Sequence, residues 1–293
     1  MKITVIFYHE ICGKEAFKGL AMSVEEGFEI LRKENLFSYS NVILYESRPI
    51  KEEWIARVHS KNWLEYVRRT QYWQCSLYSI GGFWQATEKV LKNEIDNGLV
   101  YVGVGGYHAH PDNAWGGCYF NTMAIGINLA REKLKVKRFA LIDTDTHHAD
   151  GTRDIFKTDE NILHICFCEG YPWDYNSGSK MESKTKFCFP HGISDEEEIE
   201  RVKREVPKRI EQFKPELIYW LCGLDTHKDS YGTACLTQRC YPKLARIIKE
   251  NADQVCQGKL IVKTGCNAPA YVSEYVNPRI VDCLAELGKY REG

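Results

Sequence analysis

The stretch RFALIDTDTHHADGTRDIF at residues 138–156 decides the fold and locates the chemistry. It opens with an apolar run, which is typical of a parallel strand that helices cover on both faces. Similar runs and helix-like segments alternate along the chain. We expect strands at 3–8, 98–104, 138–142, 162–167, 217–222 and 260–263, and helices at 81–97, 121–133, 195–213, 237–252 and 271–287. This alternation predicts an α/β fold in which residues 1–293 form a single domain, with one doubly wound, mostly parallel sheet and helices on both faces.

Bulk composition indicates an ordinary soluble globular protein, because 44% of the 293 residues are hydrophobic and 27% are charged. The net charge of −1 gives no reason to expect a nucleic-acid or membrane partner. The apolar run after Met1 is too short for a signal peptide, and no run reaches the length of a membrane span. We therefore expect a cytoplasmic protein, and the oligomeric state stays open.

The twelve cysteines are scattered, and no Cys-x-x-Cys pair occurs among them. In a chain of this size without a secretion signal, reduced thiols are the expected state. The spacing argues against a structural zinc site of the finger type. We expect most of these thiols to be buried as small apolar side chains.

Polar loops follow four of the expected strands, and parallel sheets place ligands at this edge. The loops read GGYHAH from residue 105, DTDTHHADG from 143, GLDTHKD from 223 and TGCN from 264. Five of the nine histidines lie in the first three loops: His108, His110, His147, His148 and His227. The loops should converge into one polar pocket that can bind a metal ion.

Asp145 and His147 occupy alternate positions, so both side chains of an extended segment would point the same way. Asp225 comes from another strand end and would supply a third ligand. Three protein ligands and one open position are typical of catalytic Zn²⁺, although Fe²⁺ or Co²⁺ suits the same set. His108 is the candidate general base, with Asp150 or Asp143 as the carboxylate that orients it.

These loops resemble the histone deacetylase, acetylpolyamine amidohydrolase and acetoin-utilisation family of zinc deacetylases. GGYHAHPDNAWGGCYFNTMAIGINLA at 105–130 is similar to the family's GGxHHA segment, and residues 138–156 are similar to its DxDxHHGxGT segment. LCGLDTHKDSYGT at 221–233 and KTGCN at 263–267 fall where the family has SAGFDAH and EGGY. The resemblance identifies a divergent member with an arginase/deacetylase-like fold.

The resemblance implies a role for each matching residue. Asp145, His147 and Asp225 take the zinc-ligand positions. His108 takes the place of the general base and Asp150 that of the carboxylate behind it, while Asp143 stands behind the first histidine of the family's pair. It also implies a structural K⁺ near Asp143, Asp145, His147 and Cys166, with Cys166 contributing its side chain or its backbone carbonyl.

Two departures concern catalytic positions. Tyr107 replaces the first histidine of the pair, and its hydroxyl is expected to hydrogen-bond Asp143. Asn267 stands where the family has a tyrosine that donates to the oxyanion, and loss of such a donor typically costs about two to three decades in rate. Tyr231 and Tyr271 are the candidates to replace that donor.

A third departure is Gly117, where the family usually has a phenylalanine in the channel wall. Trp115, Tyr171 and Trp173 are available to rebuild that wall. Glycines, which have no side chain, would bring the backbone close to the substrate. The candidate substrate-binding residues are Gly106, Trp115, Gly117, Tyr171, Trp173 and Gly223. These changes favour a ligand other than unbranched acetyl-lysine.

The sequence therefore predicts a zinc-dependent hydrolase that removes an acyl group from a small N-acylated amine, with His108 as general base. One alternative is a degenerate member that binds zinc and an acylated ligand with little turnover. Another is an arginase-like ureohydrolase with two manganese ions, but Asp225-Thr-His227 does not supply the Asp-x-Asp ligands of such a site.

Overall fold

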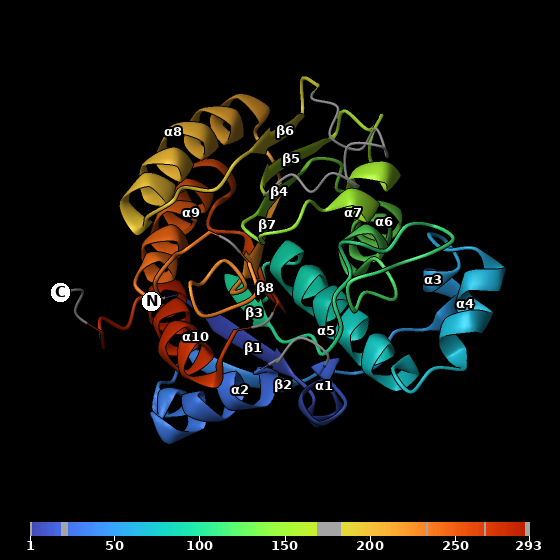
Figure 1. The fold of residues 1–293 in the computed structure, drawn as a ribbon, viewed down its shortest axis with the longest axis horizontal. Helices are drawn as coiled ribbons and strands as arrows, with labels where there is room; N and C mark the ends of the chain where they lie inside the picture. Colours follow the sequence, from blue (N-terminus) through green and yellow to red (C-terminus); the bar gives the residue numbers. More distant parts are fainter. Residues whose placement is uncertain (1, 19–22, 169–182, 233, 267, 291–293) are drawn as a thin grey trace.

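A computed structural model describes residues 2–18, 23–168, 183–232, 234–266 and 268–290. Its centre is an eight-stranded sheet in the order β2-β1-β3-β8-β7-β4-β5-β6, and every neighbouring pair is parallel (Figure 1). The strands are β1 Thr4–Tyr8, β2 Val42–Glu46, β3 Asn97–Val100, β4 Phe139–Asp143, β5 Ile162–Phe167, β6 Lys186–Phe189, β7 Leu217–Gly223 and β8 Leu260–Cys266.

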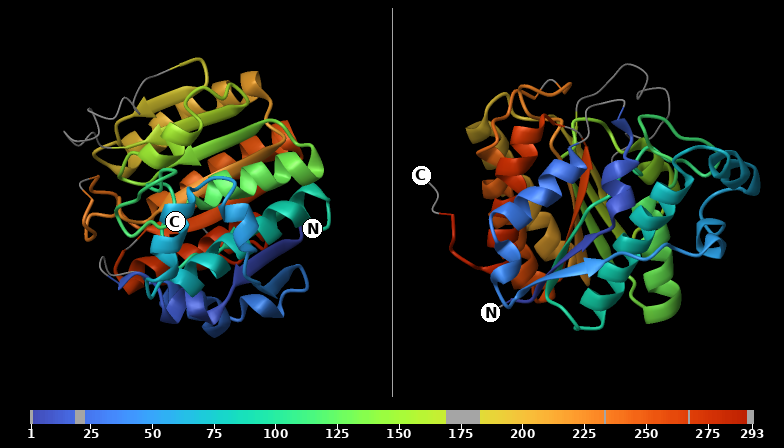
Figure 2. Two further views of the ribbon diagram at one scale, coloured as in Figure 1. Left: turned by 90° about the vertical axis from the view of Figure 1, so that its right-hand side faces the viewer. Right: turned by 90° about the horizontal axis from the view of Figure 1, so that it is seen from below.

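Helices cover both faces of the sheet (Figure 2, right). One layer contains α2 Val24–Lys33, α8 Asp195–Phe213, α9 Cys240–Cys256 and α10 Ala270–Ala285. The opposite layer contains α5 Trp73–Leu91, α6 Thr122–Leu134 and the short α7 Asp150–Ile155. The remaining short helices are α1 Glu10–Lys14, η2 Leu36–Ser38, α3 Glu52–Ile55 and α4 Lys61–Arg68. The expected doubly wound α/β fold is confirmed.

The best-predicted elements have strong local signals. Strand β5 and helix α8 have the predicted ends, and the Ser194 hydroxyl accepts from the Glu197 amide at 3.3 Å to cap α8. Strand β3 ends at Val100, before the predicted end at residue 104, and the Val102 amide bonds the side-chain hydroxyl of Thr264 in the neighbouring β8 at 3.4 Å and not a backbone carbonyl. Helix α5 begins at Trp73, eight residues before the predicted start at Gly81.

The strands at the centre of the candidate site are buried along their whole length. Every residue of β4, β5 and β7 is buried, and Trp220 in β7 has no exposed surface. Because β4 and β7 are neighbours, the loops that follow them start side by side on a rigid base. Among the described helices, none combines the length and the apolar character that crossing a membrane requires.

Candidate metal centre and active site

Three side chains meet where β4 and β7 end. One ligand atom from each of Asp145, His147 and Asp225 lies within 4.8 Å of the others. Nδ1 of His147 is 3.2 Å from Asp145 Oδ1 and 3.1 Å from Asp225 Oδ2. The structure therefore brings together the three residues that the sequence marks as metal ligands.

The loop that carries Asp145 and His147 is bent, which corrects the expectation of an extended segment. Asp143 Oδ1 accepts from the Asp145 amide at 3.0 Å, and Asp145 Oδ1 accepts from the His147 amide at 2.8 Å. Each carboxylate thus binds the backbone two residues further on, which turns the chain locally. The ligand atoms converge because of these turns and not because of strand alternation.

The charges in this group suit a divalent cation. Asp145 and Asp225 have no exposed surface. Burial and the nearby Asp145 carboxylate raise the pKa of Asp225 to about 6. Burial alone would lower the pKa of His147, but hydrogen bonds to Asp145 and Asp225 raise it to about 10. Two carboxylates and one imidazole form the donor set of a catalytic zinc site, and the residues fit that ion.

His108 and Asp150 form a buried pair beside the metal-ligand group. His108 Nδ1 lies 2.5 Å from Asp150 Oδ1, and its ring centroid is 5.8 Å from that of His147. Burial lowers the pKa of His108, although the Asp150 carboxylate opposes this shift. The imidazole is therefore neutral at pH 7 and can accept a proton.

Asp150 also has partners that the sequence did not indicate. Its Oδ2 accepts from Trp115 Nε1 at 2.8 Å and lies 3.2 Å from His110 Nε2. Trp115 stacks on His108 with ring centroids 3.6 Å apart. Trp115 therefore fixes both the general base candidate and its carboxylate, in addition to any role in the channel wall.

A tight backbone contact holds this pair in place. A Cβ atom at Gly151 would lie 2.6 Å from the carbonyl carbon of Ala109, so α7 can approach the His108 loop only with glycine there. Asn121, the N-cap of α6, donates from Nδ2 to the Ala109 carbonyl at 3.1 Å and to Thr152 Oγ1 at 3.0 Å. The loop and the two helix starts thus form one unit.

Tyr107 contacts a different carboxylate from the one expected. Its hydroxyl donates to Asp145 Oδ1 at 2.9 Å, so the expected bond to Asp143 is wrong. Asp143 lies instead with His164 and Cys166, and Asp143 Oδ2 is 4.0 Å from His164 Nε2. Burial and the Asp145 carboxylate raise the pKa of Asp143 well above its usual range. Tyr107 therefore bonds directly to a candidate metal ligand.

Phe17 takes the space beside Gly117, a contact that nothing in the sequence indicated. Gly117 has φ +71°, and a Cβ atom there would lie 2.5 Å from the Phe17 ring. Gly106 faces Thr122 in α6, since its Cβ would lie 2.8 Å from Thr122 Oγ1. Glycine at 106 therefore serves packing against α6.

The remaining predicted site residues divide into two groups. A Cβ atom at Gly223 would lie 2.5 Å from Asp145 Cα, so this glycine lets β7 approach the metal-ligand loop. The Tyr231 ring centroid is 5.6 Å from that of His147, while the Tyr271 hydroxyl is bonded to Asp229. Tyr231 therefore lies beside a candidate metal ligand, where a replacement donor would be needed. Three predicted residues lie outside the described ones: Tyr171, Trp173 and Asn267.

Asp150→Asn should lower kcat by about 10- to 100-fold, the range typical of partners that orient a ligand or base. An amide nitrogen facing His108 Nδ1 favours the tautomer with the proton on Nε2, which cannot accept another proton. The carboxylate stabilises the protonated imidazole, so its loss should also shift the acid limb of kcat/KM to lower pH. A pH–rate profile checks this, and an unshifted limb would contradict the pairing.

The chain matches a family model described as the histone deacetylase domain over residues 21–275. A protein from Archaeoglobus fulgidus named "Probable deacetylase" is 27% identical over 288 residues, covering 89% of this chain and 80% of the relative. The "Histone deacetylase-like amidohydrolase" of Pseudomonas aeruginosa is 26% identical over 255 residues, covering 78% and 67%. The crystal structure of the HDA15 HD domain has the same fold, with a TM-score of 0.84, 17% identity and coverage of 97% and 88%.

Proposed function

Because this chain belongs to the histone deacetylase family, we propose that it is a zinc-dependent amide hydrolase that removes the acyl group from a small N-acylated amine. The family and the names of its relatives indicate a deacetylase or amidohydrolase. One observation carries the proposal: the buried His108–Asp150 pair lies beside the group formed by Asp145, His147 and Asp225. A neutral base next to a metal-ligand set suits the hydrolysis of a stable amide.

Asp145, His147 and Asp225 would hold the zinc ion. A bound zinc ion lowers the pKa of water and polarises a carbonyl group. Since Asp150 occupies Nδ1 of His108, Nε2 is the ring atom that accepts the proton from water. The imidazolium then donates this proton to the leaving amine nitrogen, and the Asp150 carboxylate stabilises the charged ring in between.

Gly116 leaves room at the reacting face of the base. It has φ +59°, and a Cβ atom there would lie 2.8 Å from His108 Cδ2 and 3.5 Å from Nε2. Phe17 and Trp115 border the same loop, in place of a phenylalanine at residue 117. This altered wall supports our inference that the substrate is a small acylated amine and not an unbranched acetyl-lysine.

Other metals belong to the same proposal. Fe²⁺ or Co²⁺ suits the two carboxylates and the imidazole as well as Zn²⁺ does. A structural K⁺ near Asp143, Asp145, His147 and Cys166 would use carboxylate and carbonyl oxygens, because the Cys166 thiol is a poor ligand for a hard cation. Within the described ranges, the buried Asp143 Oδ2 has no hydrogen-bond partner, which supports a cation there.

Ureohydrolase chemistry fits this centre less well. His227 Nε2 is 3.2 Å from Gln238 Oε1, and its Nδ1 accepts from the Asp229 amide at 3.1 Å. In the described part of the chain, His227 therefore belongs to a loop network and not to the metal-ligand group. A second ion beside the first would lack this ligand.

Zinc-loaded protein should release acetate from at least one member of a panel of N-acetylated small amines, and chelator-stripped protein should release none. Acetate is measured directly. As the control, zinc added back to the stripped protein should restore the release. Release that survives removal of the metal would contradict a metal-dependent mechanism. Retained zinc and ligand binding without any release would favour the binding-only alternative.

A further inference from the structure

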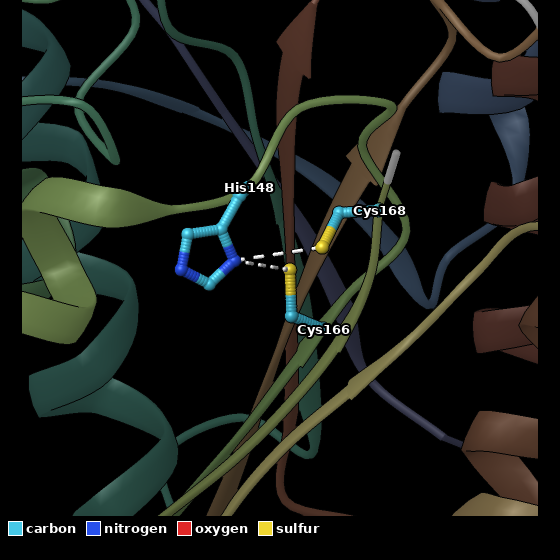
Figure 3. Close-up of side chains that lie close together, drawn as sticks. All are labelled: His148, Cys166 and Cys168. Carbon is cyan, nitrogen blue, oxygen red and sulfur yellow. Dashed lines mark hydrogen bonds between the residues drawn. The ribbon is translucent and has the colours of Figure 1, made fainter. Parts of the chain in front are cut away.

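A second group of metal-binding side chains lies behind the loop of candidate catalytic ligands. His148 follows β4, Cys166 lies in β5, Cys168 follows β5 and Cys188 lies in β6. Figure 3 shows the His148 ring pointing at the sulfur atoms of Cys166 and Cys168. Nδ1 of His148 is 3.7 Å from Cys166 Sγ, 3.5 Å from Cys168 Sγ and 3.6 Å from Cys188 Sγ.

The sheet explains how these distant residues meet. Cys166 and Cys168 are two apart on an extended segment, so their side chains point to the same face. The register of β5 and β6 pairs Cys166 with Cys188, which brings the third thiol beside the first two. His148 approaches from the β4 loop, while its neighbour His147 turns toward the catalytic group.

Hydrogen bonding does not account for three sulfur atoms around one ring nitrogen. Nδ1 carries either one hydrogen or one lone pair, and it can serve one partner well. Tetrahedral zinc places thiolate sulfur at about 2.3 Å and imidazole nitrogen at about 2.0–2.1 Å, which separates them by about 3.6 Å. The three measured N–S distances lie within 0.1 Å of that value.

A buried arginine supplies the charge that such a site needs. Arg153 is 1% exposed, and its Nη2 donates to Cys188 Sγ at 3.4 Å. Among the residues that the structure describes, Arg153 has no carboxylate partner within ion-pair distance, and its Nη1 has no hydrogen-bond partner. Three thiolates and one Zn²⁺ carry a net charge of −1, which the guanidinium would neutralise.

We propose that His148, Cys166, Cys168 and Cys188 bind a second, structural zinc ion, which anchors the catalytic loop to β5 and β6. The inference goes beyond the proposed function and does not depend on it. It also gives three of the cysteines a role other than the small apolar packing that we expect for most of them. Because His148 directly follows His147, the ion would hold the catalytic ligand in place through the backbone.

Cobalt substitution tests this site without an activity assay. Reduced, metal-free protein titrated with Co²⁺ should develop thiolate-to-cobalt charge-transfer absorption, which should be complete once two equivalents fill both sites and should have the intensity of one thiolate-bound cobalt ion. The absorption should persist in Asp225→Asn, because the catalytic group contains no sulfur. A wild-type protein that takes up cobalt without this absorption would overturn the proposal, and this measurement needs no variant.

Two substitutions sharpen the result. Cys188→Ser removes a half-buried ligand and should abolish the charge-transfer absorption and halve the zinc content from two ions to one. Cys256→Ser is the matched control, since its Sγ donates to the Lys259 carbonyl at 3.4 Å and a hydroxyl can keep that bond. The control should retain both ions. Full zinc content and unchanged absorption in Cys188→Ser would refute the assignment.

Discussion

His108→Ala should lower kcat by about 10²- to 10⁴-fold, the usual contribution of a positioned general acid–base group. The imidazole is 1% exposed, its Nδ1 is held by Asp150, and burial keeps its pKa low enough for a neutral ring at pH 7. Alanine leaves neither a proton acceptor for water nor a donor for the leaving amine. Single-turnover acetate release on the best substrate of the panel measures the chemical step directly.

The metal content separates loss of the base from loss of the site. His108 is not among the ligand groups, so the variant should retain its full zinc content. His110→Ala is the matched control, because His110 lies on the same loop and also contacts Asp150, while its other ring nitrogen faces Asp154 at 3.1 Å. We expect less than about a tenfold effect there, below the range for a direct partner of the base, because His110 contacts Asp150 and not His108 itself. Equal losses in both variants would argue against His108 as the base.

The sequence was most informative about the sheet and the loops at its edge. Buried apolar runs such as β5 are recognisable by themselves, and so is a capped acidic helix start such as that of α8. Strand β2 was missed because it lies at the edge, where Ile43 is 44% exposed. Strand β6 was missed because it is short and begins with the buried Lys186, whose ammonium donates to backbone carbonyls.

Contacts between distant segments explain what the sequence left open at the site. The position of Tyr107 indicated a hydrogen bond but not its partner, which the bend at Asp145 decides. Phe17 lies a hundred residues before Gly117, and no local pattern links the two. The thiol cluster depends on the pairing of β5 with β6, so the spacing of its cysteines along the chain gave no zinc-finger signal.

Adjacent histidines give the loop after β4 two attachments. His147 joins the carboxylates of Asp145 and Asp225, whereas His148 joins the thiols on the far side of the same loop. A catalytic ligand is precise only when its own position is fixed by surrounding contacts. The loop also bonds through the Asp145 carbonyl to His191 Nε2 at 3.0 Å, so several segments restrain it.

Asp225→Asn should weaken catalytic zinc binding by more than about 100-fold, because loss of a ligand should exceed the effect of losing an outer partner. At limiting zinc, the rate of acetate release should fall at least in proportion to the loss of zinc from this site. The side-chain amide of the variant keeps an oxygen that can accept from the backbone N–H of Thr146, as Asp225 Oδ1 does at 3.2 Å. The fold should therefore persist, while the site loses one negative charge. Zinc affinity by competition with a chromophoric chelator measures the change.

The thermal stability of the same variant should change in opposite directions with and without metal. In the metal-free chain, the buried carboxylates of Asp145 and Asp225 share the one positive charge of His147, so removing one carboxylate charge leaves a balanced pair and should leave Tm equal or higher. Zinc bound at the catalytic site should raise the Tm of the wild type. This rise should be smaller in Asp225→Asn, because the stability gained from a bound ligand increases with the affinity for that ligand. Asp229→Asn, an exposed position in the same loop, should reproduce wild-type affinity. A variant that binds zinc as tightly as the wild type would remove Asp225 from the ligand set.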